Sequence, residues 1–409
     1  MRFGLGETGR VLIGLYGPSV LLSLGQGMVV PTIPALASSF DVSAGLAAQL
    51  VTARMLGGVI ALLPVGQVLD RFGRRPVLIG GPIIVAVASS LTAVAPIFPL
   101  LLLAQFLTGL GSSAWMVARE IVAVDVVRQD QRGRMMSGFH GMNSVGVALG
   151  PVLGGLITDW FGFRAVFWGY GLMALITLAV SARIKETAQV RPRTSRSLLN
   201  IGRLSQVEPY FRTTYVVLTI NTFVAMMRGA LINSLLPLYV GLQLGYSSTA
   251  LGSLFGIYGL VNVLMIAPTG VLSDKRGRKA VVVPSTFIAT FVFLAFPLVT
   301  GIAGLSVLVA LTGVATGLAL GTMATYTYDV IPEHARARLQ TLRRLLGEIG
   351  GISGPLLGGL IADASSPGMA FWAFVPLQII AGLLITFVAR ESLRRPTETE
   401  RGVSGVSAS

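Results

Sequence analysis

The chain contains no cysteine and only two histidines, His140 and His334, among its 409 residues. Without cysteine it has no disulfide framework, no thiolate nucleophile and no cysteine-ligated zinc. Two isolated histidines provide no metal-ligand spacing and no recognisable Ser-His-Asp set. We therefore expect no bound metal, and an enzyme is a poor fit to this sequence.

A nucleotide-binding loop is also missing. The stretch from Gly109 to Ala114 matches the dinucleotide pattern Gly-x-Gly-x-x-Ala. It lies inside an apolar run with no strand before it, so the structural context that this pattern requires is absent. We expect no cofactor and no drive by ATP.

Charged residues are scarce. They make up 12% of the chain, whereas hydrophobic residues make up 53%. A soluble domain has roughly a quarter of its residues charged, so this chain cannot cover itself with polar groups and its solvent must be lipid. The 50 glycines agree with this, because small residues let membrane helices approach closely.

The net charge of +14 is concentrated in alternate loops between apolar runs. This distribution is the positive-inside pattern of membrane proteins rather than a nucleic-acid-binding face, so we expect no nucleic-acid partner. The pattern predicts a multi-pass protein of the inner (cytoplasmic) membrane with both termini in the cytoplasm. The basic loops contain Arg71, Arg74 and Arg75, then Arg128, Arg132 and Arg134, then Lys275, Arg276, Arg278 and Lys279, and finally Arg336 and Arg338.

Twelve apolar runs are long enough to span a bilayer, which takes about 20 residues. The sequence therefore predicts an all-α membrane protein with twelve transmembrane helices in two pseudo-symmetric six-helix bundles. We expect the bundles at residues 1–182 and 212–392, a cytoplasmic linker at 183–211 with a short surface helix near 197–201, and a disordered tail at 393–409. The predicted spans are 11–34, 44–69, 77–95, 98–124, 135–157 and 164–182, followed by 213–240, 248–273, 280–299, 302–328, 339–361 and 369–389.

The two halves repeat each other at a constant shift. Asp70 and Asp274 lie 204 residues apart (274 − 70), each in a loop that starts with Gly and continues with Asp, a basic residue, Gly and two basic residues. At the same shift, Asp125 returns as Asp329, and Gly150-Pro151 returns as Gly354-Pro355. A constant shift indicates that both halves share one architecture.

Two six-helix halves, a basic linker and this paired loop motif resemble the major facilitator superfamily of secondary transporters. The glycines around Pro151 resemble the antiporter motif of its twelve-helix bacterial drug/proton antiporters. Two positions differ from that subgroup: Gln105 stands where an Arg is usual in the fourth span, and the first span offers Gln26 rather than an acid. The motif residues are Gly146, Gly150, Pro151, Gly154 and Gly155.

The resemblance assigns a gating role to the loop motif. In the family, the motif Asp pairs across the interface between the halves when the protein faces outward, and a motif Arg meets the acid that ends the fourth span. The alternative is simple helix termination with charges that set orientation. The residues concerned are Gly66, Asp70, Arg71, Gly73, Arg74, Arg75 and Asp125, with Asp274, Arg278 and Asp329 as the second copy.

Ionisable residues inside predicted spans are costly and tend to be functional. Glu348, Glu120 and His140 are the candidates for proton coupling, although Arg344 and Glu348 are four residues apart on one helix face and could simply neutralise each other. Arginines outnumber acids in this zone, which favours an anionic substrate if they face the cavity unpaired. The candidates for the substrate cavity are Gln26, Arg54, Trp115, Arg119, Asn143, Asn221, Arg228, Asn233, Tyr258, Asn262, Tyr326 and Arg344.

We expect a secondary active transporter that works by alternating access, with its site at the repeat interface near the membrane midplane. The function that we expect is proton-coupled efflux of a small amphipathic or anionic molecule by a monomer. The alternatives are a uniporter or proton symporter of a small organic anion, or a transporter-like membrane receptor. Flux across a sealed bilayer would separate transport from binding alone.

Overall fold

The computed structural model describes residues 5–126, 132–184 and 204–392. A few side chains within these ranges, that of His140 among them, are outside the description. The described residues form helices and connecting turns without a β-strand, and twelve helical segments among them are long and apolar enough to cross a membrane. The predicted fold class is confirmed.

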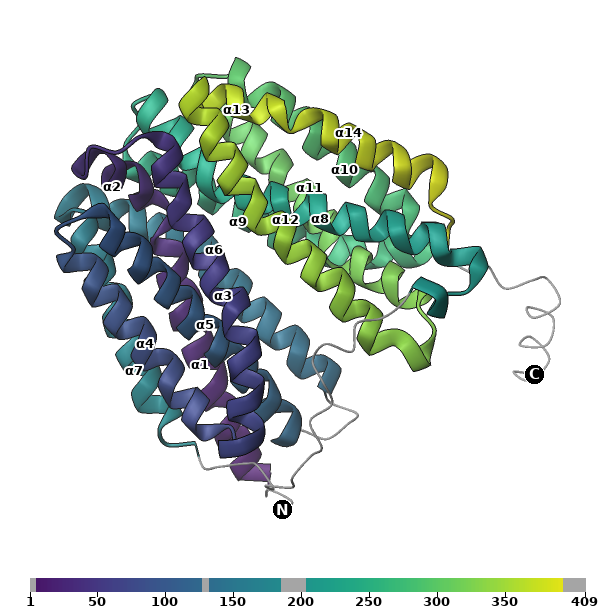
Figure 1. The fold of residues 1–409 in the computed structure, drawn as a ribbon, viewed down its shortest axis with the longest axis horizontal. Coiled ribbons are helices and arrows are strands. Elements are labelled where there is room, and N and C mark those ends of the chain that lie inside the picture. Colours follow the sequence, from purple (N-terminus) through teal and green to yellow (C-terminus); the bar gives the residue numbers. More distant parts are fainter. Residues whose placement is uncertain (1–4, 127–131, 185–203, 393–409) are drawn as a thin grey trace.

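The first half contains six membrane-crossing segments (Figure 1). The first segment bends where Pro31 and Pro34 interrupt it, because proline lacks the backbone N–H that a continuous helix needs. The helices are α1 (Leu5–Met28), the turn η1 (Val30–Thr32), α2 (Ile33–Ser39), α3 (Ala44–Phe72), α4 (Arg75–Val94), α5 (Phe98–Val126), α6 (Arg132–Phe161) and α7 (Phe163–Ser181).

The second half also contains six membrane-crossing segments. The last predicted span is divided between α13 and α14, where Pro376 starts a new helix. The elements are α8 (Arg212–Leu238), η5 (Tyr239–Gln243), α9 (Ser248–Arg276), α10 (Lys279–Ala295), η6 (Phe296–Leu298), α11 (Ile302–Val330), η7 (Glu333–Ala335), α12 (Arg336–Ala364), α13 (Pro367–Ala373), α14 (Val375–Leu383) and η8 (Leu384–Val388).

Local chemistry explains why corresponding helices start and stop at the same places. Ser43 and Ser247 lie 204 residues apart, and each caps a helix by accepting a hydrogen bond from a backbone N–H three residues on. These helices, α3 and α9, end at Gly73 and Gly277, whose φ angles of 87° and 102° favour glycine. The sequence repeat is therefore a structural repeat.

Each half has its own core. Trp115, Phe139 and Tyr170 lie in one cluster, and Phe293, Phe296 and Phe371 lie in another. A small cluster around Ala47, Ala48 and Leu238 joins the halves at one end. Large apolar side chains such as Leu103, Leu264 and Phe387 are exposed, as expected for helices in lipid.

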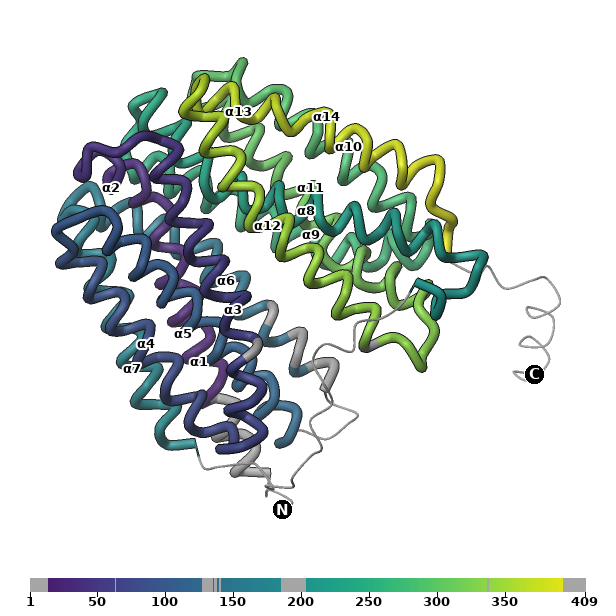
Figure 2. The backbone as a smooth tube through the Cα atoms, viewed as in Figure 1, coloured from purple at the N-terminus to yellow at the C-terminus, as the bar shows by residue number. Residues whose placement is uncertain are grey.

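The two halves meet at one end and diverge toward the other (Figures 1 and 2). They meet where the helix pairs α3–α12 and α6–α9 pack together. The diverging end contains the loop motifs at Gly73 and Gly277; we call it the basic end, and the other the closed end.

Helix α7 ends at Ser181 and α8 begins at Arg212, and the cytoplasmic linker predicted at 183–211 between two bundles stays a prediction. Two short turns, η3 (Leu204–Gln206) and η4 (Pro209–Phe211), precede α8. The predicted surface helix near 197–201 and the predicted tail at 393–409 lie outside the described residues.

Candidate functional site

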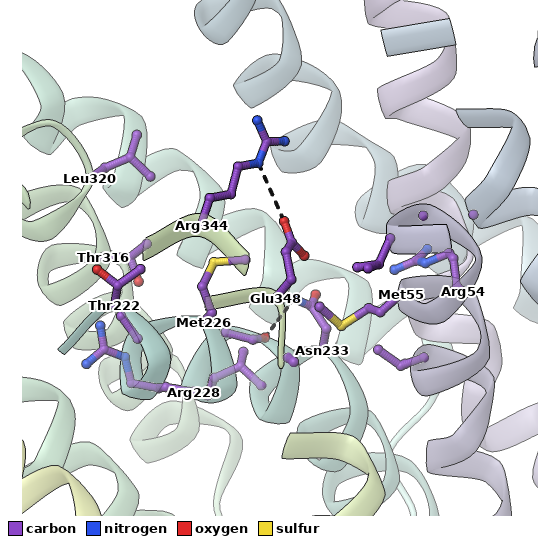
Figure 3. A pocket seen from close by; sticks show the side chains of 18 of the residues that line it. Arg54, Met55, Thr222, Met226, Arg228, Asn233, Thr316, Leu320, Arg344 and Glu348 are labelled. Carbon is purple, nitrogen blue, oxygen red and sulfur yellow. Dashed lines mark hydrogen bonds and ion pairs between the residues drawn. The ribbon is translucent and has the colours of Figure 1, made fainter. Parts of the chain in front are cut away.

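A cavity of about 520 Å³ lies between the two halves. Helices α3 and α5 of the first half and α8, α9, α11 and α12 of the second contribute to its walls. Figure 3 shows Arg54 entering from the side of α3, whereas Arg228 and Glu348 come from α8 and α12. The cavity is therefore at the repeat interface, the place where we expect the substrate site from the sequence.

The charged groups of the cavity are four arginines and one acid among the residues that line it: Arg54, Arg228, Arg343, Arg344 and Glu348. Arg344 Nε lies 3.8 Å from Glu348 Oε1, one helical turn away. The Glu348 side chain is 20% exposed and that of Arg344 is 68% exposed, so the pair is only partly desolvated. The i,i+4 pairing that the spacing allows is present.

Arg54 and Arg228 differ from the other two cavity arginines. Arg343 donates to Thr222 Oγ1 at 2.9 Å and to Gln340 Oε1 at 3.1 Å. Neither Arg54 nor Arg228 has an ion pair or side-chain hydrogen bond with any residue that the structure describes. Arg228 is nevertheless only 7% exposed.

Close helix packing fixes the position of Arg54. Gly109 of α5 lies against the Arg54 carbonyl, and Gly57 of α3 lies against the Phe106 carbonyl. A side chain at either glycine would meet backbone, so α3 and α5 can be this close only with glycine there. Arg54 therefore extends from a rigid wall.

Several predicted cavity residues share this space. Gln26, Arg54, Arg228, Asn233, Tyr258 and Arg344 line it, together with the proton-coupling candidate Glu348.

Sequence reasoning missed Arg343. The signal that could have found it is a stripe of glycines on α12 at 347, 350, 354 and 358, which face α8. Arg343 continues this stripe one helical turn earlier.

Three further candidates line a smaller neighbouring pocket of about 90 Å³: Trp115, Arg119 and Asn143. Arg119 donates to Ser19 Oγ at 2.9 Å and lies 3.5 Å from Glu120 Oε1. Its guanidinium also lies 4.5 Å from the centre of the Phe139 ring. Because its charge has these partners, Arg119 is part of the packed wall of the first half, and Glu120 is its neighbour there.

The remaining predicted cavity residues lie elsewhere, and these placements correct the expectation. Asn221 is buried and donates to the Ala381 carbonyl at 3.1 Å, so it joins α8 to α14. The Tyr326 hydroxyl donates to the Arg390 carbonyl at the basic end. Asn262 packs against Gly313 and Gly317 of α11 and is not among the lining residues. The His140 side chain lies outside the described residues.

The loop motif forms ion pairs within each half. Arg74 Nε lies 3.2 Å from Asp125 Oδ2. In the second half, Arg278 Nη1 lies 2.6 Å from Asp274 Oδ1, and Arg278 Nε lies 3.1 Å from Asp329 Oδ2. Burial lowers the pKa of Arg278, but its hydrogen bonds and charge contacts with the two acids outweigh burial and raise the pKa above its ordinary value.

Asp70 is exposed and bonds to no residue in the described part of the chain. In this conformation, the ion pairs of the loop motif are formed within each half. The predicted contact of Asp70 across the halves is not made, because the basic ends are apart in this conformation (Figure 1).

A second set of carboxylates joins the halves at the closed end, and sequence reasoning assigned it no role. Asp363 at the end of α12 accepts from Ser43 Oγ at 2.7 Å and from Gly45 N at 2.7 Å, at the start of α3. Asp159 at the end of α6 accepts from Ser248 N at 3.1 Å and Thr249 N at 2.8 Å, at the start of α9. The 204-residue repeat relates the two contacts, which we call the closed-end caps.

The glycines of the predicted antiporter motif lie between helices that meet at this end. Gly146, Gly150 and Gly154 of α6 pack against α1, and Gly155 packs against the Ser248 carbonyl of α9. The Pro151 carbonyl lies against Gly252 of α9. The motif therefore contacts both its own half and the other half.

Comparison with known proteins agrees with this architecture. The family model of the Major Facilitator Superfamily matches residues 19–215 and 218–408. Multidrug resistance protein MdtL of Shewanella oneidensis is 23% identical over 376 residues, which is 91% of this chain and 90% of the relative. MdtL of Escherichia coli O9:H4 is 32% identical over 223 residues, or 53% of this chain and 56% of the relative.

Two solved structures have the same fold. A D-xylose-proton symporter superposes with a TM-score of 0.76 at 15% identity, covering 95% of this chain and 99% of that one. A bacterial homolog of the human lysosomal transporter Spinster, in an inward-facing and unoccupied conformation, superposes with a TM-score of 0.75 at 16% identity, covering 94% and 97%. The family model matches both halves of the sequence, and the structure has a cavity between the halves. This chain belongs to the major facilitator superfamily of transporters.

Proposed function

We propose that this transporter exports a small amphipathic or anionic molecule from the cytoplasm in exchange for protons, by alternating access. The observation that carries the proposal is the cavity between the halves, with one acid, Glu348, held 3.8 Å from an arginine. The acid provides a proton site and the cavity a substrate site. The name of the MdtL relatives, multidrug resistance protein, supports export as the direction.

Orientation follows from the basic loops. They lie at the end where the halves diverge (Figure 1), and the positive-inside rule places such loops in the cytoplasm. The conformation in the structure is then the one that takes substrate from the cytoplasm. Both termini are cytoplasmic in this arrangement, and the membrane is the inner membrane.

Two sets of contacts favour opposite states of the transporter. The closed-end caps hold α3 to α12 and α6 to α9 when the basic end is open. In the opposite state, the exposed Asp70 would reach the other half as the basic ends come together. Contacts that exist in only one of two states shift the population between them, and modest strength keeps both states accessible.

Glu348 couples the proton to the substrate in this scheme. When it is ionised, it attracts Arg344. When it takes up a proton from the outer side, this attraction is lost, and both the acid and Arg344 change their interaction with whatever occupies the cavity. Because both groups line the cavity, proton and substrate compete through one ion pair, which is the requirement for exchange.

Purified full-length protein in liposomes that contain a pH-sensitive dye would test this function. After a proton gradient is imposed, amphipathic cations, anions and neutral compounds are added in turn. We expect substrate-dependent proton movement that is lost in Glu348→Gln, since glutamine keeps the shape but cannot ionise. Glu333→Gln is the matched control, because Glu333 is 92% exposed in the turn before α12.

The alternatives predict different results. Substrate flux without proton movement would rule out exchange and indicate a uniporter. Proton and substrate moving in the same direction would indicate a symporter, and binding without flux would indicate a receptor. Persistent coupling in Glu348→Gln would assign the proton site to another residue and contradict the scheme above. We propose a monomer, since each chain contains a complete cavity.

A further inference from the structure

Two arginines in the cavity, Arg54 and Arg228, have neither an ion pair nor a side-chain hydrogen bond with any residue that the structure describes. Arg54 lies on α3 and Arg228 on α8, so they belong to different halves. Glu348 is the one acid among the described lining residues, and it is already paired with Arg344. The guanidinium group stays charged at any physiological pH, so these two charges persist.

Water is a weak substitute for a counter-charge at Arg228. Arg228 is only 7% exposed, and it lies near the middle of the membrane-crossing segment 209–243. An intramembrane charge is costly without a partner, and such charges mark binding sites for ions and substrates. By contrast, Arg119 and Arg343 have partners from the protein. Arg54 and Arg228 are therefore the groups left for a ligand.

The surroundings of the two arginines define the rest of the ligand. Apolar side chains line the same cavity: Val59, Leu62, Met55, Met226, Leu320 and Met323. Figure 3 shows Met55 next to Arg54 and Met226 on the same side of the cavity as Arg228. A charged group alone would leave this surface unused, whereas an apolar body would cover it.

We propose that the ligand is an amphipathic organic anion. Arg228 of one half and Arg54 of the other lie on opposite sides of the open cavity (Figure 3), and the charged group of the ligand is held between them as the halves approach, with its apolar body on the methionine and leucine side chains. This inference rests on the proposed transport function and names the substrate class of the same cavity. Carboxylate is the simplest group that fits, because guanidinium binds it through two parallel hydrogen bonds.

The site also explains why the basic end would close only on a loaded cavity. As the halves approach, two like charges from opposite halves come together in a medium of low dielectric constant, where their repulsion is large. An anion between them reverses the sign of this interaction. Closure without substrate is therefore opposed by charge, and closure with substrate is favoured.

Binding to the purified full-length protein tests the proposal with three probes that share one apolar body: naphthylacetate, naphthylacetamide and naphthylethylammonium. Isothermal titration calorimetry measures each affinity. We expect naphthylacetate to bind most tightly and naphthylethylammonium most weakly. Arg228→Gln should weaken naphthylacetate about ten- to hundredfold, the range for a lost hydrogen bond to a charged group.

The variants separate charge from shape. Arg228→Lys keeps the positive charge and loses the paired geometry, so it should retain more affinity than Arg228→Gln. Arg54→Gln should also weaken naphthylacetate, and none of the three should change naphthylacetamide appreciably. Arg164→Gln, an exposed arginine outside the cavity, is the matched control. Unchanged melting of each variant shows that the loss is one of binding.

The proposal is overturned if naphthylacetate does not bind, if it binds no more tightly than the other two probes, or if both glutamine variants bind it as the wild type does. These outcomes are distinct from failure of the proposed function. Proton exchange driven by naphthylethylammonium in liposomes would support the proposed export function and contradict the anion site. Naphthylacetate binding that depends on the two arginines but causes no proton movement would support the anion site and contradict proton exchange.

Discussion

Arg278 shows how one residue of the loop motif organises a helix end. Its side chain is 10% exposed and contacts Asp274 and Asp329 at the ends of α9 and α11. Its backbone N–H and that of Lys279 donate to the Glu391 carboxylate at 3.0 Å each. The second motif copy is thus attached to the segment that follows the last helix through Glu391, a residue that was not predicted to belong to the motif.

We predict that Arg278→Gln lowers the free energy of unfolding by about 1–3 kcal/mol, because it removes charged hydrogen bonds between a buried guanidinium group and two acids, the partly buried Asp329 and the exposed Asp274. Thermal melting in detergent measures this. Since the pKa of Arg278 is raised, its charge and the stability that it contributes are present throughout the neutral range and are lost only in strong alkali. The loss should therefore be the same at mildly acidic and mildly alkaline pH.

Arg276→Gln is the control for this substitution, because Arg276 is exposed at the last position of α9, two residues earlier in the same sequence motif. An equal loss of stability in both variants would show that the basic character of the loop matters, rather than the pairs of Arg278.

At the scale of helices, the closed-end caps connect the start of one helix with the end of another in the opposite half. Each carboxylate accepts two hydrogen bonds at a helix start, where unpaired N–H groups and the helix dipole favour negative charge. Gly45 and Gly359 allow α3 and α12 to come close enough, since a side chain on Gly45 would meet Asp363. The same acids would separate from these N–H groups if the closed end opened.

We predict that Asp363→Asn shifts the population toward the state that is open at this end, by about tenfold, as expected when charged hydrogen bonds at a helix start become neutral ones. The chain has no cysteine, so spin labels can be placed at Ser39→Cys and Ser365→Cys without a background. Pulsed electron resonance then measures the distance across the closed end, and longer distances should gain population.

Asp41→Asn serves as the comparison at the same end. Asp41 is an exposed acid that makes no bond to any described residue of the other half, and asparagine tolerates its positive φ of 49°. A distance distribution for Asp363→Asn that matches the one for Asp41→Asn would remove the conformational role of the caps.

For the whole molecule, the orientation in the membrane decides what the open cavity faces. The basic loops gather at the end where the halves diverge (Figure 1), so cytoplasmic placement makes the structure a cytoplasm-facing state. We predict that green fluorescent protein fused after Ser409 is fluorescent in cells and that alkaline phosphatase fused there is inactive, because each reports the side of the membrane on which it folds. A fusion at Ser365, in the closed-end loop between α12 and α13, should show the opposite pattern, and a reversed result at both sites would reverse the proposed direction of transport.

The sequence by itself determined the number of membrane-crossing helices, the repeat and the loop motif. These depend on properties along the chain: the length of apolar runs, the 204-residue shift and the spacing of residues such as Asp70 and Arg74. Hydrophobic length and local helix signals require no knowledge of neighbouring helices. The same properties located Arg54, Arg228 and Glu348 within spans.

Only the tertiary structure decided which polar side chains share a space, because helix packing sets the rotation of each helix about its axis. Arg343 and Arg344 are adjacent in sequence, yet one binds Thr222 on α8 and the other pairs with Glu348. Asn221 and Tyr326 have polar side chains within predicted spans, as cavity residues do, but helix packing places them against the Ala381 and Arg390 carbonyls. The closed-end caps join residues about 90 and 320 positions apart, a distance over which sequence spacing carries no information about contact.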